Sequence, residues 1–288
     1  MAHVAVLLAL LSSALWGTAD FLGGSAARRL PVASVLGVNQ LVALLGLVPL
    51  AAVMGALGQD RAYLVPGVLA GLIGMTSLAA FYRALATGTM GVVAPIAALG
   101  VVVPIGAGLL AGEQPSLVQL VGIVLAVVGI VLASGPELTG RGRGGAVPLL
   151  LALVSALGFG SVLVLVAEGS SDGSVQAVVM VLLTMRLTSV VVLTVLLLAF
   201  ARSRGVEIGV RRRDLPVLAT IGVFDVGANG AFAVASQGDL ISVTAVLASL
   251  YPVVTVLLAR QLHAERLVGL QLVGVVGALV GVVALAAG

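Results

Sequence analysis

Charged side chains stand near the middle of two long apolar stretches of this chain. Arg186 occupies one stretch and Asp225 the next, with Asn229 four residues beyond Asp225 on the same helix face. An unpaired guanidinium in hydrocarbon costs between about 2.5 and 17 kcal/mol, so Arg186 requires a partner, and Asp225 can meet it at the same depth. We predict that Arg186 binds an anionic ligand group such as a carboxylate, with Asp225 holding its planar fork in position. The alternative is a permanent structural ion pair.

Asp20 is a third intramembrane charge, one helical turn beyond Trp16, and its sequence neighbours offer no counter-charge. A carboxyl buried without a counter-charge favours its neutral form, as a proton carrier must. If the protein couples to protons, Asp20 is the candidate carrier. The alternatives are that Asp20 joins the Arg186 network or caps a helix end.

Uncharged side chains complete the candidate ligand-binding set. Trp16, Tyr82 and Tyr251 are rare aromatics in a chain with only 3% of them, and they could stack on a ligand, gate a cavity or pack in the core. Asn39 and Gln40 are predicted to face the interior, because an amide facing lipid would lack hydrogen-bond partners.

Catalytic, metal and cofactor sites find no support. The chain has no cysteine, and its two histidines, His3 and His263, lie at predicted helix ends. No cluster of His, Cys or carboxylate residues marks a catalytic or metal centre. We therefore expect no enzyme activity and no cofactor, and an integral-membrane enzyme is disfavoured.

The elements that must position these residues are transmembrane helices. The chain has 288 residues, of which 61% are apolar and 9% charged, and its mean hydropathy is +1.28. That is too little polar surface for a soluble domain. Ten apolar stretches are long enough to cross a bilayer, approximately 4–25, 32–54, 64–86, 90–111, 117–134, 147–167, 175–199, 215–236, 241–261 and 267–286.

The chain is also an internal duplication. Glu113, Gln119, Gly122 and Gly129 recur at a constant displacement of 152 positions, as Glu265, Gln271, Gly274 and Gly281. Further echoes pair Trp16-Gly17 with Phe159-Gly160, Tyr82 with Phe232 and Gly100 with Pro252. We therefore predict repeats over 1–138 and 147–288, joined by a Gly/Arg linker at 139–146.

Five spans per repeat predict that the second copy enters the membrane with opposite orientation. Such inverted repeats recur in secondary transporters, because two similar halves can exchange conformations around a shared central site. The alternative is that duplication merely enlarged a helix bundle.

Small residues and two glutamates predict the packing of this scaffold. Gly67 with Gly71, and Gly277 with Gly281, have the GxxxG form, while Gly122 with Ala126 is a looser version. The fifth and tenth spans should play matching packing roles, and the protein is expected to be a monomer or a homodimer. Glu113 and Glu265 are interpreted as caps at the starts of those two spans.

Several motifs resemble the EamA-like family of the drug/metabolite transporter superfamily over essentially the whole chain. They are Trp16-Gly17, the segment from Phe81 to Leu85 with Gly88, Leu250-Tyr251-Pro252 ahead of Glu265, and then Gln271 and Gly274. The resemblance implies ten helices in two inverted five-helix halves and carriage of small metabolites by alternating access. Two positions depart from the family pattern: Gly100 replaces a common proline, and Asn39 replaces a common arginine.

Basic residues predict the orientation in the membrane. Twelve of the fourteen arginines fall beside the odd-numbered loops and only Arg61 lies opposite, with Arg186 inside a span. The positive-inside rule then places both termini outside, whereas the family resemblance implies cytoplasmic termini. Arginine without lysine, with abundant Ala, Gly and Val, indicates a GC-rich bacterial gene and hence a bacterial cytoplasmic membrane.

These observations together predict a secondary transporter, an exporter of small metabolites such as amino acids or related compounds. Its partners are a small-molecule substrate, the lipid bilayer and, if it is proton-coupled, protons. No nucleic acid is expected, since the cluster at Arg211, Arg212 and Arg213 suits anionic lipid. A non-transporting scaffold or regulatory membrane subunit is the alternative.

Overall fold

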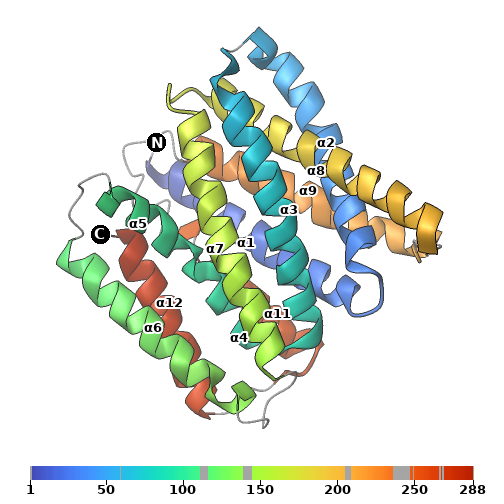
Figure 1. Ribbon diagram of the computed structural model, residues 1–288. Coiled ribbons are helices and arrows are strands. Elements are labelled where there is room, and N and C mark those ends of the chain that lie inside the picture. The colour runs from blue at the N-terminus through green and yellow to red at the C-terminus, as the bar shows by residue number, and fades with distance from the viewer. Residues whose placement is uncertain are drawn as a thin grey trace.

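The computed structural model describes a helical protein (Figure 1). It describes residues 2–58, 60–110, 116–138, 145–204, 209–235, 247–248, 250–265, 267 and 269–287. No β-strand occurs within these ranges. The predicted linker is placed only from Gly145 onward, and the capping prediction for Glu113 falls outside the described residues.

The first repeat contributes six α-helices and three short 3₁₀ turns. The helices are α1 (Ala2–Ala27), α2 (Val32–Val53), α3 (Leu64–Thr87), α4 (Met90–Ala97), α5 (Val102–Leu110) and α6 (Leu117–Leu138). The turns are η1 (Ala56–Gly58), η2 (Arg61–Tyr63) and η3 (Ala98–Val101).

The second repeat follows the same plan within its described residues. Its helices are α7 (Ala146–Gly169), α8 (Val175–Arg204), α9 (Leu215–Ala235), α11 (Tyr251–Leu262) and α12 (Gly269–Ala287), with the turn η4 at Arg212–Asp214. By the repeat displacements, α7, α8 and α9 are the counterparts of α1, α2 and α3, and α12 is the counterpart of α6.

The outer surface of this bundle is apolar. Large hydrophobic side chains such as Leu7, Val53 and Leu110 are 66%, 87% and 93% exposed. Helices that are apolar on every side are stable only in a large core or in a membrane. Six helices of the described chain are long and apolar enough to cross a bilayer, namely α1, α2, α3, α7, α8 and α9.

The predicted span 90–111 is not one continuous helix, which corrects the sequence interpretation. It divides into α4, the 3₁₀ turn η3 and α5. Pro104 lacks the N–H that would bond the carbonyl of Gly100 four residues earlier, and this favours a break there. The counterpart helix α11 begins at Tyr251, with Pro252 in its first turn. The break between α4 and α5 and the start of α11 therefore fall at corresponding positions of the two repeats.

The two repeats interlock instead of packing as separate bundles. The first helix of each repeat packs mainly against the other half: α1 lies against α9 and α11, while α7 lies against α3 and α4. Figure 1 shows α7 beside α3, and α6 beside α12. Ser12 Oγ donates to the carbonyl of Ala228 at 2.8 Å, and Thr255 Oγ1 donates to that of Gly17 at 3.0 Å. These bonds fix the register of α1 in the opposite half.

The predicted glycine seams are confirmed as close helix contacts at Gly67, Gly71 and Gly281, whereas Gly277 makes only an ordinary contact. On α3, a Cβ at Gly67 would meet the Thr184 side chain, and one at Gly71 would lie 2.7 Å from the Met185 carbonyl of α8. On α6 and α12, a Cβ at Gly129 or Gly281 would lie 2.7 Å from a backbone carbonyl of the other helix. The fifth and tenth predicted spans thus pair with each other, and their matching packing role is confirmed.

Candidate functional site

A cavity of about 350 Å³ lies where the two repeats interlock. Side chains from α1, α2, α3, α7, α8, α9, α11 and α12 line it, together with the break between α4 and α5. Seven of the nine residues proposed from the sequence meet here, namely Trp16, Asp20, Gln40, Arg186, Asp225, Asn229 and Tyr251. Its volume is at the lower end of the range typical of small-molecule pockets.

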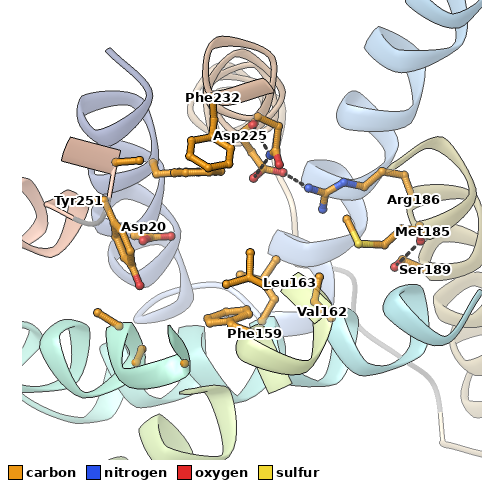
Figure 2. Close-up of a pocket in the computed structure, with 18 of the residues that line it drawn as sticks. Asp20, Phe159, Val162, Leu163, Met185, Arg186, Ser189, Asp225, Phe232 and Tyr251 are labelled. Atoms are coloured by element: carbon orange, nitrogen blue, oxygen red, sulfur yellow. Dashed lines mark hydrogen bonds and ion pairs between the residues drawn. The ribbon is translucent and has the colours of Figure 1, made fainter. Parts of the chain in front are cut away.

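Close packing of α8 on α3 sets the position of Arg186. Gly71 lets α8 approach, and Ser189, one turn beyond Met185, donates through Oγ to the Gly71 carbonyl at 3.1 Å. The Arg186 side chain then extends from α8 across the cavity wall toward α9, as Figure 2 shows. It is 7% exposed, so its charge must be compensated inside the protein.

That compensation comes from both repeats. Arg186 Nη2 lies 2.6 Å from Asp225 Oδ2, which confirms the predicted pairing. Arg186 Nη1 donates to Gln40 Oε1 at 2.7 Å. Asn229 Nδ2 donates to the Asp225 carbonyl at 2.7 Å and lies 3.3 Å from Oδ1. The Nη2–Oδ2 contact lacks the alignment of a hydrogen bond, and Nε has no partner within the described residues. Both terminal nitrogens of the guanidinium are therefore occupied by protein groups.

Asp20 lies on α1 at the far end of the cavity from Arg186. Figure 2 shows its carboxyl beside Tyr251, with Arg186 at the opposite end. No hydrogen bond or ion pair holds this carboxyl within the part of the chain that the structure describes. The alternative that Asp20 caps a helix end finds no support, because it lies inside α1, seven residues before Ala27.

Aromatic rings surround much of the cavity. The Trp16 and Phe232 ring centroids are 5.8 Å apart, and Tyr251 and Phe159 also face the space. Sequence reasoning did not include Phe159 and Phe232 among the site residues. The internal repeat could have identified them, because Phe159 is the counterpart of Trp16 and Phe232 is the counterpart of Tyr82.

Two of the proposed residues are placed elsewhere. Asn39 and Tyr82 are each 1% exposed and do not line the cavity. Asn39 Nδ2 lies 3.5 Å from the Tyr82 hydroxyl, and the Tyr82 ring packs where Gly23 leaves room on α1. The two residues join α1, α2 and α3 behind the cavity wall, which is the core-packing alternative for Tyr82.

Counterpart positions of the two repeats place different kinds of side chain in the cavity wall. Gln40 has Arg186 as its counterpart, Met75 has Asp225, and, by the Trp16–Phe159 displacement, Asp20 has Leu163. As a result, α1, α8 and α9 present charge, whereas α7 presents Phe159, Val162 and Leu163. The cavity is polar at two ends and apolar along the side between them.

An ionic cluster seals one end of the bundle, where the end of α1 meets the end of α11 and the start of α4. Arg28 Nη2 donates to Glu265 Oε1 at 2.8 Å, and Arg28 Nη1 donates to His263 Nδ1 at 2.6 Å. Nδ1 is therefore an acceptor, and Nε2–H faces Ser25 Oγ at 3.2 Å. Burial lowers the pKa of His263, Arg28 lowers it further, and Glu265 partly opposes them.

Among the described residues, Glu265 contacts the start of α4 and not the start of α12, for which the sequence predicted a cap. Its Oε2 lies 3.4 Å from the backbone N of Gly91, in the first turn of α4. The carboxylate still complements a positive helix end, but that helix belongs to the other repeat, because the interlocked fold brings α4 to it.

Comparisons with known proteins agree with this architecture. The model of the EamA-like transporter family matches residues 3–135 and again 146–287. A solved crystal structure of a protein with 16% sequence identity superposes with a TM-score of 0.66, covering 97% of this chain and 95% of the other. At that identity the likeness concerns the fold alone. No curated protein matches the chain.

The family match covers nearly the whole chain in two copies, and the described helices are apolar enough to cross a membrane several times. This protein is a multi-pass membrane protein, and it belongs to the EamA-like transporter family.

Proposed function

We propose that the protein is a secondary transporter that exports small metabolites, such as amino acids or related compounds, by alternating access. One observation carries the proposal: the cavity lies where the helix of the first repeat is interrupted at Ala98–Val101 and where its counterpart α11 begins, at Tyr251. Discontinuous helices at the interface of two repeats are a usual mark of a transport site.

The two ends of the bundle support a switching mechanism. At one end α1 packs closely on α3, with Gly24 of α1 against Leu85. The counterpart helices α7 and α9 make at most marginal contact within the described residues. In alternating access the second pair would close as the first one opens, so that the cavity faces each side of the membrane in turn.

Arg186, Asp225 and Asn229 form the proposed polar site, together with Gln40, Trp16 and Tyr251. Asp20 is the proposed proton carrier if transport is proton-coupled. The lack of a counter-charge at Asp20 and the exposure of its carboxyl to the cavity support that role.

Counterflow in proteoliposomes tests the proposal. Vesicles containing purified protein are loaded with a mixture of unlabelled amino acids and amines, and uptake of each labelled compound is compared with protein-free vesicles. A folded Arg186→Ala variant should lose about tenfold or more of the uptake rate, the effect of one lost charge-assisted contact. The exposed Arg29→Ala is the matched control. Uptake at the wild-type rate in Arg186→Ala removes this residue from the site, and indifference to a pH gradient removes Asp20 as a proton carrier.

The ten-span inverted topology is part of the proposal, with repeats at 1–138 and 147–288, a linker at 139–146 and a monomer or homodimer in a bacterial cytoplasmic membrane. The chain has no cysteine, so single cysteines can be added without removing others. We expect Asp60→Cys and Asp172→Cys to react from outside the cell with a membrane-impermeant maleimide, and Arg29→Cys and Arg212→Cys to react only after the membrane is opened. The reverse pattern places both termini in the cytoplasm, and a mixed pattern contradicts the span count.

A non-transporting scaffold or regulatory subunit is the second candidate function. It would preserve the glycine seams, yet it would have no use for an asymmetric polar cavity. Replacing Arg186 and Asp225 together without loss of the protein's cellular effect would favour it.

A further inference from the structure

When Asp20 is ionised, the charges of the cavity do not balance within the protein. Three side chains of the Arg, Lys, Asp and Glu types line it: Arg186, Asp225 and Asp20. Arg186 is paired with Asp225 at 2.6 Å and has its other terminal nitrogen on Gln40. Asp20, at the opposite end, has no partner among the described residues (Figure 2). One carboxyl group is thus left to be matched by whatever occupies the cavity.

The surroundings of Asp20 select the kind of partner. Trp16 stands one turn earlier on α1, Tyr251 lies beside the carboxyl, and Phe232 packs on Trp16. Aromatic faces attract cations, and most strongly when water is excluded. A hard metal cation needs six or more oxygen ligands, whereas this end of the cavity offers one carboxyl and rings. An organic ammonium group fits both features.

The side of the cavity adds a second requirement. Phe159, Val162 and Leu163 of α7 face the space between the two charged ends and offer no polar side-chain atom. The group attached to the ammonium would lie against this apolar side. A free carboxylate on the ligand would have to compete with Asp225 and Gln40 for the two terminal nitrogens of Arg186, because protein groups already engage both.

We propose that the cavity binds amphipathic organic cations, with the ammonium group at Asp20 between Trp16 and Tyr251 and the apolar body against Phe159 and Leu163. The inference rests on the proposed transport function, and it narrows the substrate class from small metabolites in general to amines without a free carboxylate.

Binding of three related probes tests the inference. Phenethylamine is a cation, phenylalanine a zwitterion and 3-phenylpropionate an anion, and all carry the same ring. Trp16 is the only tryptophan of the chain and lines the cavity, so its fluorescence reports occupancy directly. We expect saturable binding of phenethylamine, at least about tenfold tighter than that of the other two probes. Equal or tighter binding of the zwitterion or anion overturns the inference on the wild-type protein alone.

Variants of Asp20 provide the second arm. Asp20→Asn should weaken phenethylamine binding about tenfold or more, and Asp20→Glu should retain most of it. Asp60→Asn removes a carboxylate from an exposed turn far from the cavity lining and is the matched control. Unchanged phenethylamine affinity in a folded Asp20→Asn protein overturns the assignment of the ammonium group to Asp20.

Transport of the same probes separates this inference from the proposed function. If proteoliposomes exchange phenylalanine but not phenethylamine, the protein is a transporter and the cation inference fails. If phenethylamine binds through Asp20 but no probe crosses the membrane, the cation site stands and the transport proposal fails.

Discussion

The seam between α6 and α12 and the wall of the cavity are built from the same two repeats, yet they use the repetition in opposite ways. At the seam, counterpart residues meet each other's helices: Gly129 packs on Ala278, and Gly281 packs on Ala126. In the cavity, counterpart positions differ, as Gln40 and Arg186 do. The same packing contact can be made by both copies of the repeat, because each helix presents the same small residues to the other. A small ligand is not symmetric and therefore needs different residues from the two copies. Divergence between the copies therefore marks the residues that serve the ligand.

The largest loss of stability is expected when a cavity residue of the second repeat is replaced by its counterpart from the first. Arg186→Gln introduces the residue found at the counterpart Gln40 and leaves Asp225, whose side chain is only 17% exposed, without its cation. Removing one partner of a buried pair typically costs about 3–5 kcal/mol of unfolding free energy. Thermal unfolding in detergent, followed by circular dichroism, should show the loss.

Replacing both members of the ion pair by their counterparts from the first repeat should restore most of the lost stability. The double variant Arg186→Gln with Asp225→Met removes both charges, and replacing a buried ion pair by neutral side chains is often close to neutral for stability. We expect most of the loss to be recovered. A double variant as unstable as Arg186→Gln alone would contradict the view that the pair is self-contained.

Alanine substitutions on either helix of the α6–α12 seam should lower stability by the same amount. Gly129→Ala and Gly281→Ala each place a Cβ against backbone atoms of the facing helix, which cannot move aside as a side chain can. Overpacking of this kind costs about 1–3 kcal/mol. Gly277→Ala is the control, because its Cβ would lie 3.5 Å from the nearest atom of the facing helix. Unequal melting temperatures for the two seam variants would show that the copies are not equivalent here.

The ionic cluster distinguishes the closed end of the bundle from its counterpart, and its loss should have a smaller effect. Arg28→Ala removes the partner of Glu265, whose side chain is 4% exposed, while that of Arg28 is 28% exposed. Because Arg28 is partly solvated, we expect a loss of about 1 kcal/mol. The same melting experiment measures it against Arg29→Ala. If loss of this cluster lets the end of the bundle open more often, a cysteine placed in the cavity should react with a maleimide faster in Arg28→Ala than in Arg29→Ala.

The smallest effect should come from pH. The pKa of His263 is lowered in the folded protein, so folding disfavours its protonation. Above the pKa of about 6.5 that His263 has in the unfolded chain, the residue is neutral in both states and the folded protein keeps its full stability. As the pH falls below that value towards the lower pKa of the folded state, the unfolded chain binds a proton more readily, so stability is lost. Between pH 7.5 and pH 5.5, taken as about one unit on each side of the unfolded value, the melting temperature should fall slightly more in wild type than in His263→Gln. An identical fall in both proteins would remove His263 as the cause.

Much of this molecule could be predicted from the residues alone. Intramembrane charges are too costly to stand unpaired, so Arg186 implied Asp225 before any coordinates. The displacement of 152 positions between Gly129 and Gly281 implied that their helices share a role. Composition excluded a soluble fold, and the motifs pointed to the family whose model covers the chain. These features are local or periodic, and a sequence displays them directly.

Only the tertiary structure decided which side chains share the cavity. It placed Asn39 and Tyr82 behind the wall and brought Phe159 and Phe232 into it. It also gave Glu265 a helix of the other repeat to complement. The cause is the exchange of α1 and α7 between halves, because this sets which helix faces meet across long separations in the chain. The repeat could be read from spacing, but the interlocking depends on contacts between residues that no local pattern relates.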